Sequence, residues 1–270
     1  MLLKNGIGVY EKITEQEDAM SQLSHITNVS NKSYQRLSSG KRINVAADGA
    51  AELAISEGMN SRTNGYNVGA NNINNARNLL NISDGALGSI HDSLQRIREL
   101  AVEASNGTLT SSDREALQWE VDQLKDEISS VAKNTNYNTK NLLDGSESEL
   151  SIEMGGAKKN ISLTNASLEA LGIKDFDVTG KFNLKDIDDA IKKVSSARSK
   201  AGAQYNALEH AYNYNRNASE NLTRANSNLI DLDYGKEVTE KNKQNILQQY
   251  ALFAQRQKME QNKNKLNILN

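Results

Sequence analysis

A seven-residue repeat of apolar side chains in the first half of the sequence constrains the fold more than any other feature. One position of the repeat is held by Ile73, Leu80, Leu87, Leu94 and Ala101, and the position three residues later by Ala76, Ser83, Ile90, Ile97 and Ala104. Alternating spacings of three and four are typical of a helix that packs along a narrow seam. A helix from about residue 46 to 105 is far longer than the helices of ordinary globular domains. The sequence therefore predicts a rod in which a partner helix runs beside this one.

The partner is predicted in the second half of the chain, where a repeat of the same period returns. Its first position is held by Ile187, Val194, Ala201, Leu208, Asn215, Leu222 and Leu229. Alanine at most positions three residues later permits close approach of another helix, and Asn215 is expected to fix the register at a cost in stability. From the two repeats we predict an assembly seam that consists of Leu80, Leu87, Leu94, Ile97, Leu208, Leu222 and Leu229.

The other segments predict shorter elements. Ser112 and Glu115 have the spacing of a capping box, so a helix is predicted to start there and to fold back on the first. Alternating runs around a glycine-containing loop predict a β-hairpin near residues 150–163. Half-polar helical patterns predict a helix at each chain end. The predicted fold class is mainly α: an elongated antiparallel helical bundle or coiled-coil rod with a small β-hairpin, and N- and C-terminal helices paired in a terminal domain.

The composition argues against several classes of function. The formal net charge of -2, with both signs interspersed, gives no long-range attraction for nucleic acid. No apolar run reaches the roughly 18 residues of a membrane-spanning helix, and the start of the chain lacks the order of a secretory signal. His25, His91 and His210 are isolated, Cys is absent, and neither HExxH nor GxSxG occurs. We therefore predict no enzyme activity, no catalytic or metal-ligating residues and no cofactor.

Neither proline nor cysteine occurs among the 270 residues. Two interpretations stay open. The chain travels unfolded and has to fold promptly on arrival, without slow proline isomerisation or disulfide formation. Alternatively, a coiled-coil protein simply avoids proline because proline breaks long helices.

Four long motifs, in the same order along the chain, resemble those of bacterial flagellins. They are LSSGKRINVAADGAAELAISEGMNSRTNG (residues 37–65), LQRIRELAVEASNG (94–107), EVDQLKDEISSVAKNTNYNTKNLLDG (120–145) and ENLTRANSNLIDLDYGKE (220–237). The resemblance implies a rod domain of residues 40–166 and 187–235, a terminal-helix domain of residues 1–39 and 236–270, and a short connection at residues 167–186 in place of the variable outer domains. In flagellins the terminal helices are disordered in the free subunit and form the inner tube of the filament after assembly.

The function implied by the resemblance is that of a self-assembling structural subunit of the bacterial flagellar filament, exported through the flagellar secretion apparatus to an extracellular location. The implied partners are further copies of the chain in a helical homopolymer, a flagellar export chaperone, the filament cap and hook-associated proteins, with no nucleic acid and no membrane. Both ends of the chain depart from the usual flagellin pattern. The alternative is therefore a minor or poorly polymerising flagellin-like secreted protein, or a hook-filament junction protein.

The resemblance also implies recognition by a host receptor. Flagellins are bound by Toll-like receptor 5 through the rod, and the matching positions here are Arg96, Leu100 and Glu120. The spacing of four residues is expected to place Arg96, a forked donor, and Leu100, an apolar contact, on one helix face. The alternative is that Arg96 and Glu120 are ordinary solvated charges. Trp119, the single tryptophan, stands beside Glu120 where flagellins usually have a smaller or polar residue.

Overall fold

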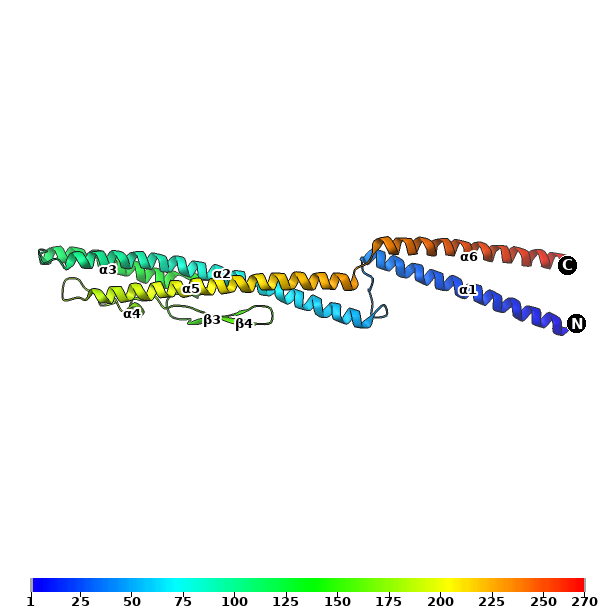
Figure 1. Cartoon of the computed structure of the whole chain (residues 1–270), viewed down its shortest axis with the longest axis horizontal. Coiled ribbons are helices and arrows are strands. Elements are labelled where there is room, and N and C mark those ends of the chain that lie inside the picture. The colour runs from blue at the N-terminus through cyan, green and yellow to red at the C-terminus, as the bar shows by residue number, and fades with distance from the viewer. Residues whose placement is uncertain (1, 270) are drawn as a thin grey trace. The chain divides into compact units, whose positions relative to one another are not determined.

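The computed structural model describes the backbone of residues 2–269 and the side chains of residues 17, 18, 20–261 and 263. Its helices are α1 (Leu2–Ser39), α2 (Ala50–Ala104), α3 (Ser111–Asn134), α4 (Leu168–Leu171), α5 (Leu184–Ile230) and α6 (Tyr234–Leu269), and its strands are β1 (Asn136–Tyr137), β2 (Lys140–Asn141), β3 (Glu149–Glu153) and β4 (Lys158–Ser162). They form two compact units: residues 61–222, and residues up to 60 together with those from 223 onward. The predicted fold class is confirmed, including the hairpin and the paired terminal helices (Figure 1).

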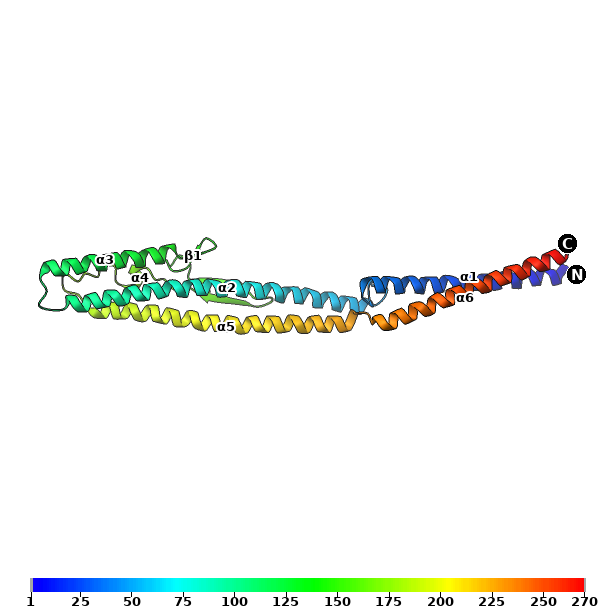
Figure 2. The same cartoon turned by 90° about the horizontal axis from the view of Figure 1, so that it is seen from above.

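The unit of residues 61–222 is built on α2 and α5, which run antiparallel and side by side, with α3 next to them (Figures 1 and 2). All ten residues of the first predicted seam are buried, and so are the residues of the second seam as far as Asn215. The larger apolar cluster includes Leu87, Leu94 and Ile97, and the smaller one includes Leu80 and Leu208. The heptad interpretation is therefore confirmed for both long helices.

Polar pairs between α2 and α5 specify their register. Arg77 lies 3.8 Å from a carboxylate oxygen of Glu209, and Arg98 donates to Asp188 at 2.8 Å. The step from Arg77 to Arg98 along α2 equals the step back from Glu209 to Asp188 along α5, as antiparallel pairing requires. The pair of Arg98 and Asp188 is exposed, and ion pairs at the surface contribute little to stability. The buried seam therefore carries the stability, and the polar pairs select one alignment of the helices.

The start of α3 differs from the prediction. Its N-cap is Thr110 and its capping partner is Asp113, rather than Ser112 and Glu115. The Asp113 N–H donates to Thr110 Oγ1 at 3.2 Å, and the Thr110 N–H donates to the Asp113 carboxylate at 2.9 Å. The bonds from Thr110 hold the pKa of Asp113 below its usual value. Two pairs with the same spacing overlap in this stretch, and the earlier one begins the helix.

The β3–β4 hairpin forms where it was predicted, and its tip is bound to the long helices. A Cβ atom at Gly69 of α2 would lie 2.5 Å from the carbonyl carbon of Met154, so only glycine permits this approach. Asn72 of α2 donates to the Glu153 carbonyl at 3.0 Å, and Asn215 of α5 donates to the Met154 carbonyl at 3.0 Å. Asn215, which is predicted to fix the register of the helix pair, thus bonds the hairpin tip to α5, and Asn72 bonds it to α2.

Residues 167–186, predicted as a short connection, are part of the packed core. The segment contains α4, and Ile173, Phe176 and Val178 are buried within the larger cluster. The ring of Phe176 stands edge-on to that of Phe182, with 5.8 Å between the ring centroids. The segment is therefore a folded part of the bundle. A two-residue strand pair, β1–β2, also precedes the hairpin and had no counterpart in the sequence prediction.

In the other unit α1 and α6 lie side by side, and the linkers next to them are joined by backbone hydrogen bonds (Figures 1 and 2). Lys41 and Asp231 form an antiparallel bridge, and the Arg42 N–H donates to the Ile230 carbonyl at 2.7 Å. After this linker α2 begins at Ala50, later than predicted. The linkers belong to this unit, and the compact units divide within α2 and α5 rather than at the linkers.

Candidate functional site

Arg96, on the exposed side of α2, forms the centre of the first candidate surface. Its Nε donates to Glu120 of α3 at 2.7 Å, and its Nη1 donates to Glu99 at 3.1 Å. These bonds, that to Glu120 first, raise the pKa of Arg96. The side chains of Arg96 and Glu120 are 48% and 44% exposed. The predicted pair is therefore brought together on an open surface, joined by Glu99, which the sequence reasoning had not included.

Leu100 does not belong to that surface. Its side chain is 1% exposed and lies in the larger apolar cluster with Ile97 and Ala104. The prediction that Leu100 faces outward beside Arg96 is therefore wrong. Leu100 lies three residues after Ile97 and four before Ala104, which is the spacing of the seam itself. Arg96 directly precedes Ile97 of the seam, and its side chain reaches solvent.

Trp119 is the most exposed large apolar side chain that the structure describes. It is 77% exposed and directly precedes Glu120 on α3. The indole ring therefore lies outside the bundle core, to which the same helix contributes Val121 and Ile128. A large aromatic side chain is therefore open to solvent in the residue next to Glu120, on the same helix.

The predicted assembly seam is used within the single chain. Five of its seven residues, Leu80, Leu87, Leu94, Ile97 and Leu208, are buried between the helices of one chain. Leu222 and Leu229, toward the end of α5, are half-buried. The five buried residues hold the bundle together and are not available to a neighbouring molecule, so contacts between chains have to use other faces.

A row of exposed apolar side chains on α6 offers such a face. Ile246, Tyr250 and Phe253 are 67%, 70% and 59% exposed, and their spacing places them on one side of the helix. The half-buried positions of α6 carry small or polar residues, among them Lys241, Gln244, Gln248, Ala251 and Ala254. An amphipathic helix ordinarily buries its apolar side. The reversed arrangement leaves the apolar face exposed in the single chain, and we call this face the α6 stripe.

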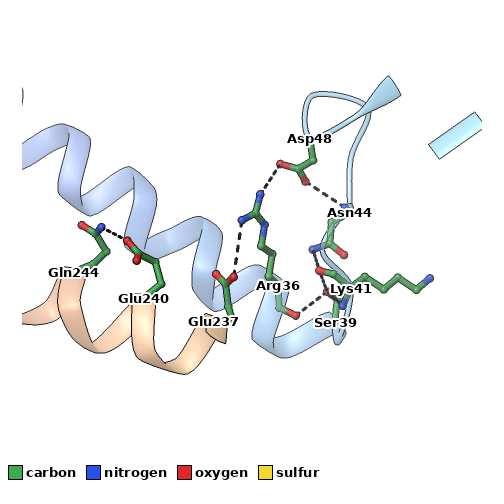
Figure 3. A network of polar contacts seen from close by, with 8 residues as sticks. All are labelled: Arg36, Ser39, Lys41, Asn44, Asp48, Glu237, Glu240 and Gln244. Carbon is green, nitrogen blue, oxygen red and sulfur yellow. Dashed lines mark hydrogen bonds and ion pairs between the residues drawn. The ribbon is translucent and has the colours of Figure 1, made fainter. Parts of the chain in front are cut away.

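Arg36, near the end of α1, links two nearly buried carboxylates in the same unit (Figure 3). It lies 4.0 Å from Asp48 and 4.0 Å from Glu237, whose side chains are 9% and 12% exposed. Asp48 also accepts backbone hydrogen bonds from Asn44 at 3.2 Å and Val45 at 3.3 Å. One guanidinium thus supplies the positive charge for a carboxylate of the linker and a carboxylate of α6.

The Asn44 N–H, and after it the Val45 N–H and the positive charges of Arg36 and Lys32, hold the pKa of Asp48 below its usual value, although burial acts in the opposite direction. Ionised Asp48 therefore stabilises the folded chain above the pKa of about 3.9 of an unfolded aspartate. This contribution is lost as the pH falls through the lower folded-state pKa.

We expect Asp48→Asn to lower the unfolding temperature at neutral pH, and to change it little in strong acid, where the unmodified chain has already lost the same contribution. Thermal unfolding followed by circular dichroism over a pH series measures this difference. The matched control is Asp18→Asn, since Asp18 is exposed on α1 and takes part in no ion pair that the structure describes. An equal effect of Asp48→Asn at both ends of the series would contradict the assignment.

The described side chains contain no cluster that could hold a metal ion. Nowhere among them do three His, Cys, Asp or Glu residues gather closely enough to hold an ion. His91 lines a groove of about 510 Å³ between α2 and α5. The charged residues of that groove, Asp84 and Arg198, form an ion pair at 2.9 Å. Within the described part of the chain, no helix has the length and apolar character needed to cross a membrane.

Residues 12–148 match the family model of the bacterial flagellin N-terminal helical region, and residues 184–266 match that of the bacterial flagellin C-terminal helical region. The chain is 39% identical over 239 residues to a flagellin of Halalkalibacterium halodurans. This match covers 84% of this chain and 88% of the relative. It is 36% identical over 289 residues to a flagellin of Bacillus subtilis, with 91% and 95% of the two chains covered.

A solved structure from Vibrio parahaemolyticus, of a protein described as hook-associated, is similar with a TM-score of 0.58. The match covers 68% of this chain and 100% of that chain at 16% sequence identity. At this identity the likeness shows a shared fold and nothing about a shared role.

Proposed function

Because this chain belongs to the bacterial flagellin family, we propose that it assembles with copies of itself through the α6 stripe and the outer faces of its rod helices. Flagellins are structural subunits of the extracellular flagellar filament and are not enzymes.

The exposed α6 stripe carries this proposal. Ile246, Tyr250 and Phe253 are all more than half exposed in the single chain, and fully burying a side chain of this size contributes about 1.5–3 kcal/mol. A second copy of the chain offers the same stripe, so repeated contacts bury it without any other partner. The five buried seam residues of α2 and α5 do not compete for this role, because they are already packed inside their own bundle.

We also propose the domain division that the family implies. In it, residues 1–39 and 236–270 form a terminal domain that becomes the inner tube, and residues 40–166 and 187–235 form the rod. The polar and small residues at the half-buried positions of α6 support a terminal pair that orders fully only on assembly, because its own interface buries few apolar atoms. Amide hydrogen exchange on the monomer tests this, since strong protection of α6 would contradict ordering on assembly.

Salt-induced assembly of the purified chain, followed by electron microscopy and sedimentation, tests filament formation directly. Long helical filaments that pellet are the expected result. If the chain stays monomeric under conditions in which a related flagellin polymerises, the alternative holds: a poorly polymerising secreted flagellin or a hook-filament junction protein.

The exposed stripe also requires cover before assembly, which supports a role for a flagellar export chaperone. The filament cap and hook-associated proteins are proposed as partners at the ends of the polymer on the family relationship alone. Size-exclusion chromatography of the chain with each purified partner from one source organism tests these contacts. The expected result is a complex with the chaperone that the α6 stripe variant described below loses.

We further propose recognition by Toll-like receptor 5 through Arg96 and Glu120, with Trp119 at the edge of the contact. The support is that Arg96 and Glu120 are joined on an open surface of the rod. Leu100 has no direct part in this proposal, since its side chain is buried. The ion pair between Arg96 and Glu120 leaves Nη2 of the guanidinium without a bond that the structure records, so it can donate to a receptor group.

Arg96→Ala is expected to weaken binding to the receptor ectodomain by roughly fivefold or more, as commonly found when a central interface arginine is lost. Thermal unfolding should stay nearly unchanged, because the residue is exposed. The matched control is Arg98→Ala, which removes a similarly exposed arginine and its ion pair with Asp188 from the same helix. Binding is measured by surface plasmon resonance. If the unmodified chain, Arg96→Ala and Arg98→Ala bind with equal affinity, Arg96 is an ordinary solvated charge and does not contact the receptor.

A further inference from the structure

The turn between α2 and α3 contains an Asn-Gly pair, Asn106–Gly107, outside any helix or strand. Both residues are exposed. An asparagine followed by glycine is the pair most prone to lose its side-chain amide, because glycine has no side chain to hinder attack by its own backbone nitrogen. The reaction still needs a backbone that can bring this nitrogen to the asparagine side chain, so the surrounding structure decides whether it occurs.

We propose that Asn106 is a site of spontaneous deamidation in the folded chain. The backbone nitrogen of Gly107 attacks Cγ of Asn106, a C–N bond forms, and the side-chain nitrogen leaves as ammonia. The nitrogen of Gly107 loses its proton to solvent, and the leaving group takes one up. Water then opens the five-membered succinimide at either carbonyl, which gives aspartate or isoaspartate. The reaction consumes only water, and no enzyme or oxidant is required.

The turn favours this reaction in three ways. The Thr108 N–H donates to Oδ1 of Asn106 at 3.1 Å, which folds the side chain back over the Gly107 peptide. In the described part of the chain no hydrogen bond from the Gly107 N–H is recorded, so the nucleophile is not held elsewhere. A Cβ atom at Gly107 would meet no atom within 4 Å outside the neighbouring residues, so no other part of the chain crowds this turn.

The chain provides an internal comparison in Asn64–Gly65, which lies inside α2. There the N–H of Gly65 belongs to the helical hydrogen-bond ladder, and the helical backbone does not let this nitrogen reach the preceding side chain. Reaction at Asn64 therefore requires local opening of a helix that is anchored in the core. Asn106 requires no such opening, because its turn is already outside the helix.

Deamidation changes the turn in charge and in length. The formal net charge of the chain goes from -2 to one unit more negative, and the new carboxylate lies in the turn whose Asn106 carbonyl accepts from Arg114 at 3.4 Å. Isoaspartate also adds a methylene group to the backbone between α2 and α3. In an extracellular filament the converted fraction rises with time since synthesis, so this position records the age of a subunit. That use rests on filament assembly, whereas the amide loss itself occurs in the free subunit as well.

The test is peptide mass spectrometry after incubation of the full-length chain in mildly alkaline buffer. Trypsin releases ELAVEASNGTLTSSDR between Arg98 and Arg114, in which Asn106 is the single amide side chain. We expect Asn106 to deamidate roughly tenfold faster than Asn64 or more, because helix opening is unfavourable. In urea the two sites should react at similar rates, which shows that the fold causes the difference.

Gly107→Ala is the matched variant, since the added Cβ has open space and Gly107 does not have a positive φ. It should slow the loss of the Asn106 amide several-fold, with circular dichroism and thermal unfolding unchanged. Comparable rates at Asn106 and Asn64 in the folded chain, or an unchanged rate in a folded Gly107→Ala variant, would overturn the proposal.

Discussion

Replacing Ile246, Tyr250 and Phe253 together by serine is expected to abolish filament formation while the unit of residues 61–222 stays folded. The three side chains are 67%, 70% and 59% exposed in the single chain, so their removal takes little packing away from the monomer. If neighbours cover them, the loss is roughly 4 kcal/mol or more per subunit contact, which is about a thousandfold in the association constant. Pelleting assays and electron microscopy at fixed protein concentration measure the effect.

The control for this variant lies on the same helix. Asn242, Gln249 and Gln257 are exposed polar residues of α6 that lie on or next to the same face, and their joint replacement by serine alters the helix by the same number of positions while the three apolar side chains stay in place. This control should polymerise like the unmodified chain. Normal filaments from the stripe variant would show that the terminal contact lies elsewhere, and failure of both variants would point to loss of α6 itself.

The helical framework could be predicted from the sequence because its signal is local. Leu87, Leu94 and Ile97 recur at helical spacing, and a residue at that spacing has to lie on one side of the helix whatever packs against it. The second repeat, with Leu208, has the same property. Burial of both repeats follows from their period, and the short turn after α2 predicts that α3 folds back beside α2.

The candidate receptor surface was predicted only in part, for a reason visible at Leu100. The motif implied that Arg96 and Leu100 are neighbours on one face of the helix. On an ideal helix, two residues four positions apart point in directions that differ by about 40 degrees around the helix axis. This difference is enough for Arg96 to lie on the exposed surface while Leu100 lies in the buried seam. The spacing of Leu100 from Ile97 and Ala104 was the signal that could have assigned it to the core.

Contacts between segments that are distant in the sequence could hardly be predicted from the sequence. Asn215 stood out as a polar residue in an apolar repeat, but its partner, the Met154 carbonyl, lies on a hairpin whose docking no local pattern describes. The same holds for Phe176, which is buried in a segment that resembles a linker. Such contacts depend on how the folded elements pack against one another. A periodic pattern in the sequence indicates only which side of an element is buried.

The α6 stripe shows a different limit. The sequence identifies Ile246, Tyr250 and Phe253 as one apolar face, yet periodicity alone does not tell whether that face packs within the chain or against another chain. Helix α1 lies beside α6, but the half-buried side of α6 is the polar one. Only the placement of the helices distinguishes the two cases, and here it favours contact with another chain.

Two glycine-to-alanine substitutions in α2 are expected to act with opposite sign, and they test how the hairpin is held. Within a helix, alanine is favoured over glycine by about 0.5–1 kcal/mol. Gly85→Ala should increase the free energy of unfolding by this amount, because a Cβ atom there meets no atom within 4 Å. For a unit of this size the unfolding temperature should rise by roughly 1–4 °C.

Gly69→Ala should instead lower the unfolding temperature. Its Cβ would lie 2.5 Å from the Met154 carbonyl carbon and 2.7 Å from the Gly155 nitrogen, and backbone atoms cannot rotate away as a side-chain end can. Overpacking of this kind costs about 1–3 kcal/mol, and displacement of the tip also breaks the hydrogen bonds from Asn72 and Asn215. Amide exchange at residues 154–157 separates local release of the hairpin from global destabilisation. If Gly69→Ala is as stabilising as Gly85→Ala, the hairpin tip is not seated on α2, and the bundle depends on its helices alone.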